Sequence, residues 1–131
     1  MTSSRQAMSA YQAGARLASD PRQSLFLLHD GAARALNAAI FAYEQNALDQ
    51  TCLQVARAHR ILCGLLTHLN FDGAGAAGAQ LRALYLRLAQ RIVCVMSDSD
   101  VPGSLRSCAD ILQILRDGDA KEIQVSTLKS R

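Results

Sequence analysis

The chain of 131 residues contains no tryptophan, only two prolines and only two glutamates. Aromatic residues make up 5% of the sequence, which is too few for a platform on which nucleic-acid bases stack. The net charge of +3 comes from scattered basic residues, so we expect no nucleic-acid partner. Because Glu44 and Glu122 are the only glutamates and no Glu-x-x-His pair occurs, a di-iron bundle is excluded.

Other signals are also missing. No apolar run approaches the ~18 residues that span a bilayer, so we expect no membrane insertion. The polar start of the chain lacks the apolar region of a secretory signal peptide, which predicts a cytoplasmic location. Phosphate-binding glycine loops and serine-nucleophile motifs are absent as well. We therefore expect neither an enzyme nor a bound cofactor.

The four cysteines form no CxxC pair and are interpreted as reduced packing residues. Cys52, His59 and Cys63 fall along one flank of a predicted helix. His59 and Cys63 could share a zinc ion if Cys94 or His29 supplied a further ligand. The simpler interpretation is an ordinary helix flank, and we predict no metal site.

Four helices are predicted from apolar periodicity and from the glycine, proline and turn residues between them. They cover about 21–45, 50–69, 77–96 and 102–117, and Gly118 is expected to end the last one. Short connections favour antiparallel neighbours, so the predicted fold is all-α, an antiparallel up-down four-helix bundle with a short N-terminal helical segment. We divide the chain into an N-terminal segment (1–18), which is mobile or docked on a groove, the bundle (19–118) and a disordered tail (119–131).

The first predicted helix carries two apolar stripes. Asp20 can cap its free N–H groups and Pro21 suits its first position. The stripe expected in the core comprises Leu25, Leu28, Ala32, Leu36, Ala39, Ile40 and Tyr43. The second, which we call the small-residue stripe, comprises Leu27, Gly31, Ala35, Ala38 and Ala42. Because small residues let another backbone approach closely, this second stripe predicts a surface that receives a helix.

Three polar or aromatic residues are ambiguous from the pattern alone. His29 lies near the core stripe and is interpreted as a satisfied core-edge histidine, not as a catalytic base. Tyr85 is expected in the core or at its edge. Tyr11 belongs to a segment with too few apolar residues to fold alone. That segment is either docked on the bundle or disordered.

Several motifs occur together and in order. Ala10-Tyr11 is followed by Ser19-Asp20-Pro21 and by the apolar run from Leu25 to His29-Asp30-Gly31. A leucine-rich stretch then leads into Asn70-Phe71-Asp72-Gly73, and Gln80-Leu81-Arg82-Ala83-Leu84-Tyr85 comes next. Over about residues 8–117 this combination resembles the FliS family of flagellin export chaperones. His29 stands where that family usually has tyrosine.

The resemblance implies a cytoplasmic protein that binds the C-terminal segment of flagellin, prevents premature polymerisation and keeps the subunit competent for export. It also implies that the Tyr11 segment occupies part of the groove in the free chaperone. The export gate, a co-chaperone and an anti-sigma factor are further candidate partners. The alternative is a small helical adaptor or regulator that self-associates through the same surface. The candidate flagellin-binding residues are Tyr11, Leu27, Gly31, Ala35, Ala38, Ala42, Leu86 and Val93.

Overall fold

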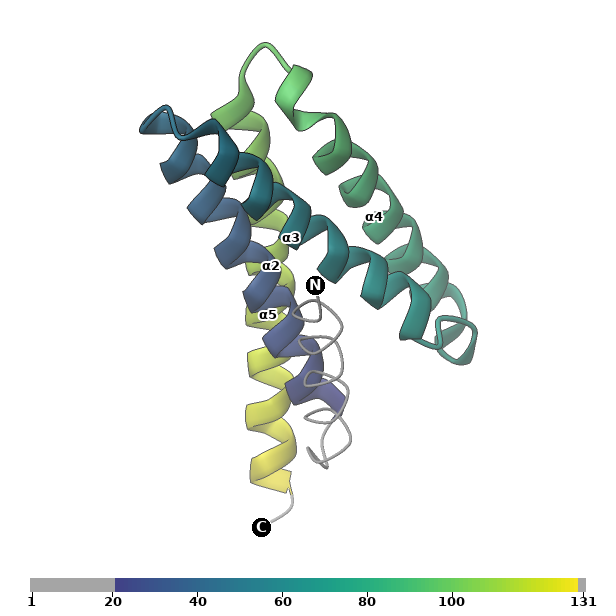
Figure 1. The fold of residues 1–131 in the computed structure, drawn as a ribbon. Coiled ribbons are helices and arrows are strands. Elements are labelled where there is room, and N and C mark those ends of the chain that lie inside the picture. The colour runs from purple at the N-terminus through teal and green to yellow at the C-terminus, as the bar shows by residue number, and fades with distance from the viewer. Residues whose placement is uncertain (1–20, 130–131) are drawn as a thin grey trace, which may run out of the picture.

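Four long helices are arranged as an antiparallel bundle (Figure 1). The computed structural model describes the backbone of residues 21–129 and the side chains of residues 23–119. The elements are α2 (Pro21–Glu44), α3 (Leu48–His68), the short 3-10 helix η1 (Asp72–Ala74), α4 (Gly75–Cys94), η2 (Val95–Ser97) and α5 (Val101–Lys129). No strand occurs between residues 21 and 129. The predicted all-α bundle is confirmed, whereas the N-terminal segment 1–18 lies outside the described residues.

Helix α2 is the central element of the bundle. It packs most extensively against α5 and against α3, while α4 rests mainly on α3 and touches α5 less. The core stripe predicted for α2 is buried at Ala32, Leu36 and Ala39, as the helical period indicated. Each fully buried leucine contributes about 1.5–3 kcal/mol relative to an exposed one. The largest fully buried side chains are Tyr85, Leu36, Leu62, Leu65, Leu88, Ile92, Leu105, Leu112, Val95, Thr51 and Cys108.

The turns use the residue types that their backbone requires. Between α2 and α3, Asn46 adopts a left-handed φ of 60°, and the Ala47 N–H donates to the Ala42 carbonyl at 2.9 Å. At the start of α5, the Gly103 N–H donates to the Asp100 carboxylate at 3.1 Å, so Asp100 is the N-cap. These local bonds fix where α3 and α5 begin.

Two helix ends differ from the sequence prediction. Helix α4 begins at Gly75, directly after η1, and not near Ala77. The prediction that Gly118 ends the last helix is wrong, because α5 continues to Lys129. Helix propensity is a weak preference that a tertiary contact can override, and Asp119 makes such a contact with α2. The division of the chain into an N-terminal segment, a bundle and a tail stays a prediction.

Candidate partner-binding surface

The small-residue stripe of α2 runs along the margin between the solvent-facing and buried sides of the helix. Leu27 is 52% exposed and Ala38 also faces solvent, whereas Gly31 is half-buried. Ala35 and Ala42 are buried, at 2% and 8% exposure. The bundle covers Ala35 and Ala42, and α3 and α5 are the helices that pack on α2. The role of the small-residue stripe as a surface that receives a client helix stays a prediction.

The two candidate residues on α4 lie seven positions apart, and therefore on one side of that helix. Val93 is 63% exposed and Leu86 is half-buried. The backbones of α2 and α4 are not adjacent, and the two helices meet in the core through the side chains of His29 and Tyr85. The structure therefore does not bring Leu86 and Val93 next to the exposed residues of α2. The remaining candidate, Tyr11, lies outside the described residues.

The exposed apolar side chains that the sequence analysis missed include one on α2 and one on α5. Phe41 on α2 is 66% exposed and Ile114 on α5 is 71% exposed. Phe41 follows Ala38 by three positions and Leu27 by fourteen, so all three lie on the solvent-facing side of one helix. Its position off the core stripe was the signal that could have identified it. We call Leu27, Ala38 and Phe41 the α2 apolar row.

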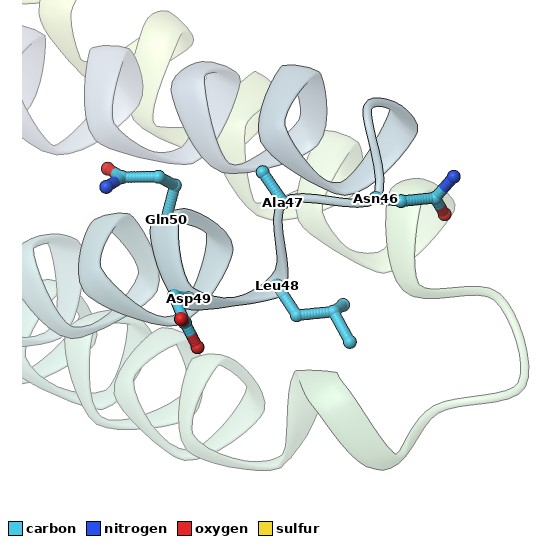
Figure 2. A pocket seen from close by; sticks show the side chains of 5 residues that line it. All are labelled: Asn46, Ala47, Leu48, Asp49 and Gln50. Atoms are coloured by element: carbon cyan, nitrogen blue, oxygen red, sulfur yellow. The ribbon is translucent and has the colours of Figure 1, made fainter.

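A shallow hollow lies at the turn between α2 and α3 and is lined by residues 46–50 (Figure 2). Figure 2 shows that Asn46, Asp49 and Gln50 point in different directions. Since these polar groups do not converge, the hollow offers no arrangement for binding a small ligand or for catalysis.

The one buried polar cluster among the described residues joins three helices, and we call it the His29 junction. His29 on α2 is 2% exposed. Its Nδ1 lies 2.5 Å from the Asp119 carboxylate on α5, and its Nε2 lies 2.6 Å from the Tyr85 hydroxyl on α4. A carboxylate oxygen accepts, so Nδ1–H donates to Asp119, and in that tautomer the Tyr85 hydroxyl donates to the lone pair of Nε2.

The environment of the His29 junction is that of a structural element. Burial, and secondarily the nearby Asp119 carboxylate, raise the pKa of Tyr85 far above its ordinary value. His29 and Tyr85 are both sealed from solvent, at 2% and 0% exposure, so a substrate has no access to the imidazole. His29 is therefore a fully buried histidine with both nitrogens satisfied, deeper than the core-edge position that the pattern predicted.

The cysteines do not share one role. Cys108 is buried, but Cys52, Cys63 and Cys94 are exposed, so the packing interpretation is wrong for these three. They lie on the solvent flanks of their helices. The Cys63 sulfur is 3.7 Å from the His59 ring on the exposed side of α3. Among the described residues, no three cysteine, histidine, aspartate or glutamate side chains are grouped as metal ligands would be.

Comparison with known proteins decides the family. The sequence model described as flagellar protein FliS matches residues 4–121. The chain belongs to the FliS family. It therefore has the general role of a flagellar chaperone, and the resemblance inferred from the motifs is confirmed. No curated protein matches this FliS-family chain. None of the helices described is both long and apolar enough to cross a membrane.

Proposed function

We propose that this FliS-family chain is a cytoplasmic export chaperone for flagellin. It binds the C-terminal segment of the newly made subunit, prevents premature polymerisation and keeps the subunit competent for flagellar type III export. The observation that carries the proposal is the α2 apolar row, which leaves Leu27, Ala38 and Phe41 facing solvent in a member of a flagellar chaperone family. An apolar row on a helical bundle suits recognition of an amphipathic client helix.

The placement of the candidate residues indicates how the client is bound. Val93 and Leu86 lie on α4, whose backbone is not adjacent to that of α2. The candidate residues are thus divided between two helices. We therefore infer that the flagellin segment contacts the bundle at two or more places and orders as it binds, which buries a large surface at moderate affinity per unit area.

The N-terminal segment enters the proposal through Tyr11. If this segment occupies part of the client surface in the free chaperone, removal of residues 1–18 raises the apparent affinity for flagellin, because the competing state is eliminated. If Tyr11 instead contacts the client, the same deletion lowers the affinity. The buried apolar residues of α2, α3, α4 and α5 pack against one another, so the deletion is expected to leave the helical circular dichroism signal of the bundle intact.

The test is a calorimetric titration of the full chain with a peptide that carries the C-terminal segment of flagellin, together with light scattering. A monomeric free protein that forms a 1:1 complex supports the proposal. A free protein that is already a dimer and gives no heat with the peptide identifies the alternative, a helical adaptor that self-associates through its exposed apolar side chains. A monomer that gives no heat contradicts both.

A further inference from the structure

Helix α5 continues through a residue that ought to end it. Gly118 is exposed, and a Cβ placed there would meet nothing within 4 Å, so no close packing requires glycine. A glycine inside a helix costs about 1 kcal/mol relative to alanine. Residues 119–129 nevertheless remain helical. A contact beyond Gly118 must therefore offset the weak point.

Asp119 makes that contact directly after the glycine. Its carboxylate is 14% exposed and receives the Nδ1–H of His29. One turn earlier, Arg116 donates to Asp30 of α2 at 3.0 Å, so α5 is also tied to α2 just before Gly118. Because α2 and α5 are antiparallel, α5 passes the first turns of α2 at Asp119, and its last turns extend beyond the start of α2 (Figure 1).

Tyr85 completes the arrangement from a third helix. Its hydroxyl donates to Nε2 of His29, and its ring packs edge-on against Phe71 at a centroid distance of 6.0 Å. This bond holds the imidazole in the tautomer whose Nδ1–H points at Asp119. The orientation of the His29 imidazole, which binds Asp119, therefore depends on α4 as well as on α2.

We propose that the His29 junction is a conformational latch: it keeps α5 helical beyond Gly118 and seated on α2, and without it the helix ends at Gly118. The extension 119–129 thus has two states, seated and frayed, and the junction determines which is populated. Loss of Asp119 also leaves the His29 Nδ1–H without a partner in the core, which adds to the cost. The inference does not depend on the identity of the client.

The experiment is amide hydrogen exchange on the full chain, with residues 119–129 compared with residues 105–112 of the same helix. In Asp119→Ala we expect exchange of 119–129 to accelerate at least tenfold while 105–112 change less than threefold. Asp117→Ala is the matched control, because it removes an equal charge two residues earlier from a 67% exposed side chain that does not touch His29. It should change both regions less than threefold.

Two further variants test the individual parts of the latch. Adding Gly118→Ala to Asp119→Ala should restore most of the protection of 119–129, since the helix then lacks its weak point. Tyr85→Phe changes no residue of α5, yet it should accelerate exchange of 119–129 more than that of 105–112. Equal acceleration of both regions in Asp119→Ala, or unchanged protection of 119–129, would overturn the proposal. If the exchange rates of residues 119–129 are unchanged in Tyr85→Phe, Tyr85 is not part of the latch.

Discussion

At the scale of single residues, two alanines of α2 show how narrowly the surface and the core are separated. Ala35 is 2% exposed, whereas Ala38, three positions later, faces solvent. A methyl group is tolerated both in the core and on the surface, so the residue type does not show which alanine is buried. A charged substitution distinguishes them, because its cost depends on whether the site is dry.

Ala38→Glu is expected to weaken binding of the flagellin segment more than tenfold, about 1.4 kcal/mol, because it places a charge at an apolar contact. The free protein should melt at nearly the same temperature, since Ala38 is exposed. Asn37→Glu, on the adjacent exposed position, is the control and should bind almost normally. Leu36→Glu should unfold the bundle, because Leu36 is fully buried. Normal binding by Ala38→Glu in a stable bundle would place the client surface elsewhere.

The cysteines are expected to differ in reactivity towards a thiol reagent. Burial raises the pKa of the Cys108 thiol. The nearby charge of Asp98 also raises this pKa, whereas that of Arg91 lowers it by less than burial raises it. Because the thiolate is the reactive form, Cys108 should be labelled slowly in the native protein. The exposed Cys52, Cys63 and Cys94 should react fast. Rapid labelling of all four thiols in the native wild-type protein would contradict the burial of Cys108. The Cys108→Ala variant identifies the slow site, because the slow phase should be missing from it.

At the scale of the elements, the junction between η1 and α4 depends on one glycine. A Cβ at Gly78 would lie 1.9 Å from the Phe71 carbonyl oxygen and 2.9 Å from the carbonyl carbon. Both are backbone atoms, so the strain cannot be relieved by a side-chain rotation. The glycine-rich start of α4 looked like a poor helix from its propensity alone, yet Gly78 allows α4 to pack closely on the preceding turn.

Gly78→Ala should therefore destabilise the protein by about 1–3 kcal/mol, despite the gain in helix propensity. Gly118→Ala is the matched control, because a Cβ at Gly118 meets nothing within 4 Å. That variant should be stabilised by up to about 1 kcal/mol. Urea denaturation measures both changes. Stabilisation by Gly78→Ala would show that the close approach to Phe71 is not kept in solution.

At the scale of the whole molecule, Tyr85 links stability to alkaline pH. Burial, and then the Asp119 carboxylate, raise its folded-state pKa far above the unfolded value of about 10. Below pH ~10 the phenol is protonated in both states and stability does not change with pH through this group. Above pH ~10 only the unfolded state releases the proton, so the free energy of unfolding falls by about 1.4 kcal/mol per pH unit.

Urea denaturation of wild type and Tyr85→Phe between pH ~9 and pH ~11 checks this dependence. The wild type should lose stability more steeply than Tyr85→Phe over that interval. Since the other titrating groups are common to both proteins, their contribution cancels in the difference. Parallel slopes would mean that Tyr85 ionises in the folded protein as easily as in the unfolded chain.

The helical period was sufficient to predict the bundle and the core face of α2, because burial follows a repeat that is written locally in the chain. It could not show that Ala35 and Ala42 are covered, since that depends on how α3 and α5 flank α2. It also placed the end of α5 at Gly118, because the Asp119–His29 bond joins residues ninety positions apart. The role of the α2 apolar row in flagellin binding stays a prediction.

The most extensive helix pairing joins α2, the first described helix, to α5, the last. Residues 45–100 lie between them in the chain. During synthesis, α2 and α3 therefore leave the ribosome well before the partner that completes their core has been translated. Because a domain folds as a unit, the bundle closes only when α5 has emerged. A chain that is interrupted before α5 cannot present a finished binding surface, so the protein becomes competent only once α5 has been translated.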